Sequence, residues 1–342
     1  KVDEDLRSVY YNAIYLPSID VFSALGIALV IWYGGGKFVQ DQIQLGVLVA
    51  FLQYLQKFFE PIRDLAEKFN IIQTAIASAE RTFELLDVPE ETVDSHSSQV
   101  LKQVRGEIEF RNVWFSYKKD EYVLKDISFS ISEGESLAVV GATGAGKSSL
   151  VNALCRFYEI NKGDILLDGV SINKINKQSL RRQISLVQQD VFLFSGSILD
   201  NIRLGNSRLE VSQVKSIAKS VNLDQFVDCL PDKYEQDVRE RGNLLSLGQK
   251  QLLSFARALV ADPKILVLDE ATSSIDTETE LQVQSGIKEL IRGRTSIIIA
   301  HRLSTLKNVD KILVLKEGHV SEYGTRKELL QKKGIYWKLY NL

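Results

Sequence analysis

Apolar residues dominate the first part of the chain in two runs. Residues 11–33 form a 23-residue apolar stretch with a single charged side chain, Asp20, which is long enough to cross a bilayer as a helix. A second apolar run, residues 45–59, continues into a pattern in which apolar side chains recur at helical spacing. These side chains are Leu65, Phe69, Ile72, Ile76 and Ala79. We therefore expect residues 1–87 to form a helical hairpin with an extended second helix.

The environment of this hairpin has two interpretations. The glycines at 34–36 and the polar residues 37–44 predict a turn between two membrane-spanning helices. In a spanning helix, Asp20 would face a helix bundle or an aqueous cavity, because an ionised group against lipid is costly. It is then a candidate residue of a substrate path. The alternative is a soluble hairpin buried against a partner, because Asp20, Gln53 and Gln56 interrupt the apolar runs and the second run is short for a bilayer.

Short apolar segments separated by helical patterns follow a polar linker at residues 88–105. We expect a second domain over residues 106–342. It begins with two short alternating strands, around 108–110 and 113–115, and a further strand at 124–131. The later strand candidates are 136–140, 164–167, 184–187, 265–268, 296–299 and 312–315. Helices are expected at 150–157 and 250–261. This alternation predicts an α/β fold with a mostly parallel sheet, whose ligands bind at the carboxyl ends of the strands.

Composition narrows the classes of function. The net charge is −2 and the pI is near 6.1, so no basic field favours nucleic acid as a partner. Two cysteines, Cys155 and Cys229, are too few for a disulfide framework and indicate a reducing compartment. Because the chain begins at Lys1 and contains no methionine, we expect it to be part of a longer protein.

A glycine-rich segment between a predicted strand and a predicted helix matches the phosphate-loop pattern G-x-x-x-x-G-K-[ST]. The residues assigned to phosphate binding are Gly141, Ala142, Thr143, Gly144, Ala145, Gly146, Lys147, Ser148 and Ser149. The glycines allow left-handed turns and a close approach of backbone N–H groups to phosphate. Lys147 supplies a cation for the β- and γ-phosphates, and the hydroxyl of Ser148 is a ligand for Mg²⁺. The sequence therefore predicts a site for a nucleoside triphosphate with Mg²⁺.

Two carboxylates end the apolar strand at 265–268. Adjacent charges do not suit a buried strand, and a metal ion with an attacking water explains them. We expect Asp269 to hold Mg²⁺, through water, and Glu270 to orient or deprotonate the nucleophilic water. The structural alternative is an acidic pair at a helix N-terminus.

Five further motifs, together with the phosphate loop, resemble the ATPase domain of ABC transporters over residues 106–342. The segment Leu245-Ser246-Leu247-Gly248-Gln249 resembles the family's signature sequence, and Ser274-Ile275-Asp276 resembles its D-loop. The remaining matches are Tyr117 for the aromatic residue that stacks on adenine, Gln189 for the glutamine loop and His301 for the switch histidine.

The resemblance implies roles for these residues. Lys147, Gln189, Glu270 and His301 would act in hydrolysis, with Ser148, Gln189 and Asp269 at the metal. Tyr117 offers a flat ring to adenine, and His301 would stabilise charge on the γ-phosphate. Ser246, Gly248 and Gln249 would contact the nucleotide of a partner domain, so that two domains enclose two nucleotides, and Asp276 is also assigned to nucleotide binding. Glu240 resembles an exporter-type loop residue that contacts the opposite subunit.

One position departs from the family pattern. Leu247 replaces the first glycine of the signature and removes backbone freedom beside the second phosphate site. We expect a working site, although a weaker site in a heterodimer remains open.

The combined fold prediction is an α/β P-loop NTPase of the ABC type, with a mostly parallel sheet, an antiparallel β subdomain and a helical subdomain, preceded by a transmembrane helical hairpin. The resemblance implies an ATP-hydrolysing motor of an exporter, multi-pass in the cell or inner membrane, with its ATPase domain in the cytoplasm. Its partner is a second nucleotide-binding domain in a homodimer or heterodimer, and its substrate is a lipid, a hydrophobic drug or a peptide. The alternatives are a soluble ABC-type ATPase in DNA repair or translation, and a regulatory nucleotide-binding module without hydrolysis.

Overall fold

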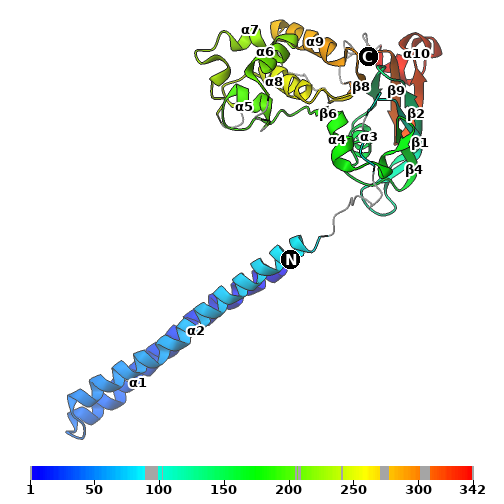
Figure 1. Cartoon of the computed structure of the whole chain (residues 1–342). Helices are drawn as coiled ribbons and strands as arrows, with labels where there is room; N and C mark the ends of the chain where they lie inside the picture. The colour runs from blue at the N-terminus through cyan, green and yellow to red at the C-terminus, as the bar shows by residue number, and fades with distance from the viewer. Residues whose placement is uncertain are drawn as a thin grey trace. The chain divides into compact units, whose positions relative to one another are not determined.

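A computed structural model covers the 342 residues of the chain. The described residues are 2–88, 99–101, 103–204, 206, 209–239, 242–269, 277–300 and 309–340. The chain divides into two compact units, Lys1–Pro89 and Glu90–Leu342. We call the first the helical unit and the second the sheet unit (Figure 1).

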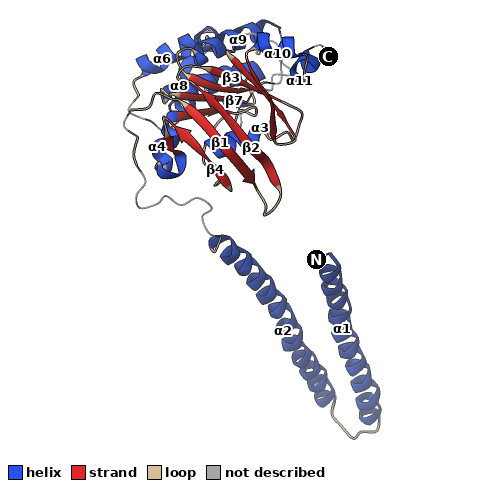
Figure 2. Cartoon of the chain, turned by 90° about the vertical axis from the view of Figure 1, so that its right-hand side faces the viewer, coloured by secondary structure: helices blue, strands red, loops and turns tan. Residues whose placement is uncertain are grey.

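The helical unit is a hairpin of two long helices, α1 (Val2–Val39) and α2 (Leu45–Leu86), which lie side by side in both views (Figures 1 and 2). The prediction that the glycines at 34–36 begin the turn was wrong, because α1 continues to Val39. A Cβ at Gly34 would lie 2.6 Å from Cδ1 of Leu48 on α2. The absence of a side chain at Gly34 therefore makes room for the second helix.

Most of the apolar side chains of this hairpin are exposed. Among the described residues of the unit, Ile19 is the one buried hydrophobic side chain, while Phe22, Leu29 and Trp32 are 63, 60 and 78% exposed. The segment Pro17–Val39 is long and apolar enough to cross a membrane, and it is the one such segment in the described part of the chain. Asp20, within it, forms an ion pair with Arg63 of α2, so its charge has a partner on the neighbouring helix.

The sheet unit contains two sheets. The antiparallel sheet has the order β2-β1-β4-β5, with β1 (Ile108–Ser116), β2 (Tyr122–Ile131), β4 (Lys162–Leu167) and β5 (Val170–Ser171). The second sheet has the order β10-β9-β3-β8-β7-β6 and is parallel except for the β9–β10 hairpin. Its strands are β3 (Ser136–Val140), β6 (Ile184–Val187), β7 (Ile265–Asp269), β8 (Thr295–Ile299), β9 (Lys311–Lys316) and β10 (His319–Gly324). These observations confirm the expected α/β fold with a mostly parallel sheet.

Two boundaries differ from the sequence-based expectations. The two short strands expected around 108–110 and 113–115 are one strand, β1, whose register shifts near Asn112, a residue with φ of 47°. An irregularity of this kind shifts the pairing without ending the strand, which a period-2 pattern alone does not reveal. The helices begin earlier than expected, at Lys147 and Leu247, because the loop motifs themselves form the helix N-termini.

Helices cover the parallel sheet, and their packing forms two cores. The helices are α3 (Lys147–Leu154), α4 (Lys177–Gln183), α5 (Ile198–Arg203), α6 (Val211–Ser220), α7 (Leu223–Val227), α8 (Leu247–Val260), α9 (Thr277–Ile291), α10 (Arg326–Lys332) and α11 (Ile335–Tyr340), with short 3-10 turns at Ile172–Lys174 and Lys233–Glu235. Leu137 and Val139 of β3 belong to the core shared with α3 and the antiparallel sheet. Ala138 and Val140 belong to the core shared with α5–α9. This alternation is what a strand buried on both faces requires.

Candidate functional site

The phosphate-loop motif connects the buried strand β3 to helix α3, at the carboxyl end of the parallel sheet. A Cβ at Gly141 would overlap the carbonyl oxygen of Leu315 on β9, so the first position of the loop requires a close backbone approach. Gly146, the N-cap of α3, has φ of 104° and provides no side-chain cap. The first N–H groups of α3 therefore have no side-chain cap at this end of the helix, which is the arrangement that binds phosphate.

Lys147 holds the loop together. Its side chain is only 8% exposed, and Nζ donates hydrogen bonds to the carbonyl oxygens of Gly141 at 2.8 Å and Ala142 at 3.1 Å. Burial lowers the pKa of Lys147, and the negative charge of Asp269 opposes this shift. The ammonium group thus lies inside the loop and within electrostatic reach of the carboxylate at the end of β7.

The donor atoms near Lys147 suit magnesium. Asp269 ends β7 and is paired in register with Ile299 at the end of β8, and the hydroxyl group of Ser148 lies in the first turn of α3. Carboxylate and hydroxyl oxygens are hard ligands, and Mg²⁺ is commonly held by one or two of them together with substrate phosphates. Among the described residues, no group of three or more His, Cys, Asp or Glu side chains forms a metal cage. The donor set therefore fits a magnesium ion that is bound together with a nucleotide.

Tyr117 follows β1 and is fixed over the first turns of α3. Its hydroxyl donates to Oγ of Ser149 at 3.2 Å and accepts from Nδ2 of Asn152 at 2.9 Å. The rings of Phe115 and Tyr158 contact it edge-on at 4.7 and 5.0 Å between centroids. The residue remains 46% exposed, so part of the ring is accessible to a base. Asn152 was not among the residues predicted from the sequence, although its i+3 spacing from Ser149 on a helix was a usable signal.

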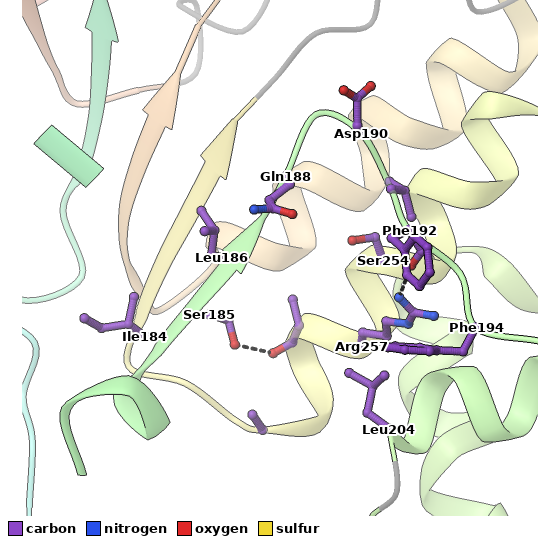
Figure 3. A pocket seen from close by; sticks show the side chains of 13 residues that line it. Ile184, Ser185, Leu186, Gln188, Asp190, Phe192, Phe194, Leu204, Ser254 and Arg257 are labelled. Atoms are coloured by element: carbon purple, nitrogen blue, oxygen red, sulfur yellow. Dashed lines mark hydrogen bonds between the residues drawn. The ribbon is translucent and has the colours of Figure 1, made fainter. Parts of the chain in front are cut away.

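Gln189 lies two residues beyond β6, in an exposed segment. Figure 3 shows this segment beside α8, with Asp190, Phe192 and Phe194 bordering a groove of about 450 Å³. Arg257 of α8 donates to the carbonyl oxygen of Phe192 at 2.6 Å.

Arg257 also donates to the carbonyl oxygen of Asn201 at 2.7 Å and to Oδ1 of the same residue. Burial lowers the pKa of Arg257 to about 10. Asn201 is 1% exposed, and its Nδ2 donates to the carbonyl oxygens of Phe194 and Ser197, each at 2.9 Å. These contacts tie the segment after Gln189 to α8. These contacts could not be predicted from the sequence, because an arginine in an amphipathic helix has no distinctive pattern.

The signature motif forms the N-terminus of α8. Ser246 is the N-cap: its Oγ accepts from the N–H of Gln249 at 3.3 Å, and Oε1 of Gln249 accepts from the N–H of Ser246 at 2.8 Å. Gly248 is buried, whereas Leu247 is 38% exposed and is the first helical residue. In Figure 1, α8 and α3 lie apart within the sheet unit. That the signature motif serves the phosphate loop of a partner domain stays a prediction.

Several residues assigned from the sequence lie outside the described residues. They are Glu240, Glu270, Asp276 and His301. Their assigned roles stay predictions. Among the assigned residues that are described, the structure joins Tyr117 to Ser149 by a hydrogen bond and brings Lys147 within electrostatic reach of Asp269.

Comparison with known proteins gives consistent matches for both units. A family model described as "ABC transporter" matches residues 124–273. The chain is 44% identical over 325 residues to the uncharacterized ABC transporter ATP-binding protein YknV of Bacillus subtilis, with 95% of this chain and 54% of that protein covered. It is 41% identical over 344 residues to a fatty acid ABC transporter ATP-binding/permease protein of Mycobacterium tuberculosis (99 and 54% covered). It is 40% identical over 337 residues to an ATP-dependent lipid A-core flippase of Syntrophus aciditrophicus (98 and 56% covered).

A solved structure extends the match to the whole fold. It is a bacterial Atm1-family ABC exporter with ATP bound, 33% identical, with a TM-score of 0.72, covering 99% of this chain and 59% of that one. The chain thus spans a little over half the length of the curated relatives that it matches. Residues 124–273 match the ABC transporter family model, so the sheet unit carries a nucleotide-binding domain of the ABC transporter type.

Proposed function

We propose that this chain is part of an ABC exporter half and supplies its ATP-hydrolysing motor. The observation that carries the proposal is that an apolar helical hairpin and a complete phosphate-loop domain lie on one chain, with 99% of it matching an ATP-binding/permease protein. A soluble ATPase in DNA repair or translation has no use for a hairpin whose apolar side chains are exposed. A non-hydrolysing regulatory module is disfavoured by the motif residues Glu270 and His301.

The residues of the sheet unit have complementary roles around ATP. The N–H groups of the loop and of the first turn of α3 hold the phosphates, while Lys147 shifts from the loop carbonyls to the β- and γ-phosphates. Ser148, Asp269 and Gln189 would hold Mg²⁺, which when bound neutralises phosphate charge during transfer. Glu270 orients or deprotonates the attacking water, and His301 donates a hydrogen bond to the γ-phosphate. Tyr117 stacks on the adenine.

Two such chains, or this chain and a different half, are needed to complete each site. Ser246, Gly248, Gln249 and Asp276 would contact the nucleotide held by the partner domain, since α8 lies apart from α3, the helix that follows the chain's own loop (Figure 1). ATP would favour the closed pair of domains and ADP would not, so hydrolysis reopens it. The linker at 88–105 joins this cycle to the membrane helices, so that closure drives them toward an outward-facing state.

The membrane part determines location and substrate. We assign residues 1–87 to the last two spans of a multi-pass domain, with residues 106–342 in the cytoplasm. The relatives' names mention a fatty acid and lipid A-core, so an amphiphilic lipid is the substrate class that we propose first. Hydrophobic drugs and peptides are the alternatives to be tested in the same assay.

The test is ATP hydrolysis and lipid flipping by the full-length protein in proteoliposomes. We expect Mg²⁺-dependent turnover in the wild type and its loss, by at least about a hundredfold, in the Glu270→Gln variant. The matched control is Glu289→Gln, an exposed change on α9. Unchanged turnover in the Glu270→Gln variant would contradict the assignment. ATP binding without turnover by the wild type alone would instead require a different half-transporter as partner.

A further inference from the structure

A glutamine inside the signature helix is buried without an evident reason. Gln251 lies on α8, five residues after the N-cap Ser246, and is 6% exposed. Its Oε1 atom is shielded from solvent and has no hydrogen-bond partner within the described part of the chain. A buried carbonyl oxygen that lacks a partner costs about 1–3 kcal/mol. Such an atom therefore calls for a partner that the described side chains do not supply.

Gln251 lines a small cavity between the ends of two strands and two helices. The cavity has a volume of about 20 Å³. Its polar lining residues are Gln251 of α8, Gln188 immediately after β6, and Asp269 at the end of β7. The apolar lining residues are Val187, Phe255, Leu268, Val283 and Ile287. A single water needs roughly 10–15 Å³ and two to four polar partners, and this cavity offers both.

We propose that Gln251 holds one buried water that positions the carboxylate of Asp269. The water donates one hydrogen bond to Oε1 of Gln251 and the other to the carboxylate of Asp269, and it accepts one from the side-chain amide of Gln188. Each polar side chain that lines the cavity then forms a hydrogen bond with the water, and Oε1 of Gln251 gains a partner. Gln251 is in this arrangement a positioning residue, since it acts on Asp269 through the water.

The consequence is a link between the two nucleotide sites, which rests on the proposed function. The N-terminus of α8, at Ser246, would contact the nucleotide of the partner domain. Gln251, little more than one helical turn further along the same helix, reaches the metal carboxylate of the chain's own site. A displacement of α8 that follows binding at one site would therefore change the orientation of Asp269 at the other.

The variant that tests this link is Gln251→Met, which removes the amide and nearly keeps the volume of the side chain. The matched control is Gln331→Met, the same change at an exposed position of α10. Both are made in the full-length Glu270→Gln background, and the affinity of the ATP complex for Mn²⁺ is measured by electron paramagnetic resonance. Loss of an outer-shell partner weakens metal binding by about ten- to a hundredfold. We expect about a tenfold loss for Gln251→Met and none for the control.

A second measurement uses the same substitutions with Glu270 intact. We expect the cooperativity of ATP hydrolysis with respect to ATP to fall in Gln251→Met and to stay unchanged in Gln331→Met. A merely structural role of Gln251 would lower the amount of folded protein and leave both the Mn²⁺ affinity and the cooperativity of the folded fraction unchanged. That outcome would overturn the proposal.

Two outcomes separate this inference from the proposed function. Full turnover by Glu270→Gln would refute the hydrolytic assignment itself. Loss of turnover in Glu270→Gln, combined with wild-type Mn²⁺ affinity and cooperativity in Gln251→Met, would refute only the role of Gln251. If Gln251→Met does not fold, a high-resolution map of the wild-type ATP complex decides. A water about 3 Å from both Oε1 of Gln251 and Asp269 supports the proposal, and an empty cavity overturns it.

Discussion

The close contact between Gly141 and β9 leads to a quantitative prediction for Gly141→Ala. The new methyl group would overlap the carbonyl oxygen of Leu315 and lie 3.1 Å from Cβ of Ala145. Leu315 cannot rotate this oxygen away, because it belongs to β9, which pairs with β3 on one side and β10 on the other. Overpacking of this kind costs about 1–3 kcal/mol, and an immobile backbone atom places the cost near the upper end of that range. We therefore expect the overlap to lower the free energy of unfolding by about 3 kcal/mol. The reduced freedom of the unfolded chain returns about 0.5 kcal/mol, so the net loss is about 2.5 kcal/mol.

Gly134→Ala is the matched control, since it separates backbone strain from overlap. Gly134 has φ of 72° and open space where its Cβ would lie. A left-handed alanine costs about 1–2 kcal/mol, and the same entropic gain brings the net cost to about 1 kcal/mol. For a domain of this size, 1 kcal/mol shifts Tm by about 2–4 °C. Gly141→Ala should accordingly lower Tm by about 5–10 °C and Gly134→Ala by about 2–4 °C.

Thermal unfolding of the full-length protein, followed by intrinsic fluorescence, measures both shifts. Added ATP should raise Tm in the wild type and in Gly134→Ala, because a ligand that binds only the folded state stabilises it. The rise should be small in Gly141→Ala, whose loop is displaced. Equal Tm losses in the two variants, or a Gly141→Ala variant as stable as the wild type, would refute the argument from the Leu315 carbonyl.

Two further predictions concern buried cations. Burial lowers the pKa of Lys147, so ATP affinity should fall as pH rises through a pKa below the usual lysine range, and binding should take up a proton there. Without ATP, folding stability should rise with pH in the same window, since the unfolded chain binds more protons. Calorimetry in two buffers measures the uptake, which Lys147→Met should abolish. Arg257→Lys should lower the free energy of unfolding by about 2–3 kcal/mol, because a lysine side chain cannot donate to both Phe192 and Asn201 as the guanidinium group does. The control Arg292→Lys, at an exposed position, should leave Tm unchanged. Equal decreases in Tm for Arg257→Lys and Arg292→Lys would contradict the role of the Arg257 contacts.

Sequence patterns predicted the central sheet well because its strands are buried on both faces. Runs such as 137–140 and 265–268 are apolar at every position, and no other element of that length suits them. The helical hairpin was predicted because its first apolar run is long enough for a spanning helix and because apolar residues recur at helical spacing after its second run. The glycines at 34–36 were misread because glycine favours a turn only when no neighbouring helix needs the space. Leu48, which lies on α2 and follows Gly34 by 14 positions in the chain, occupies the space beside Gly34. A local sequence pattern does not contain this information.

The phosphate loop could be predicted because its chemistry is local: nine consecutive residues contain the glycines, the lysine and the hydroxyl groups. The surroundings of the site are not local. Tyr117 is oriented by Ser149 and Asn152, which follow it by 32 and 35 positions, and Arg257 reaches back 56 residues to Asn201. Such contacts arise only after the strands have paired, so they are properties of the fold and not of any window of sequence.

The geometry of α8 bears on whether Leu247 impairs the signature motif. A glycine is required where the backbone is left-handed or where a Cβ would collide, and Leu247 has neither problem: it is the first residue of α8, with a helical backbone, and its side chain is 38% exposed. The groups that would meet a phosphate are the hydroxyl of Ser246 and the N–H groups of the first turn, and neither depends on the residue at 247 being glycine. Leucine also favours the helix by about 1 kcal/mol relative to glycine. The substitution therefore changes the surface that a partner domain meets more than the anion site itself, and competence of this signature should depend on how well the partner's loop accommodates an apolar side chain there.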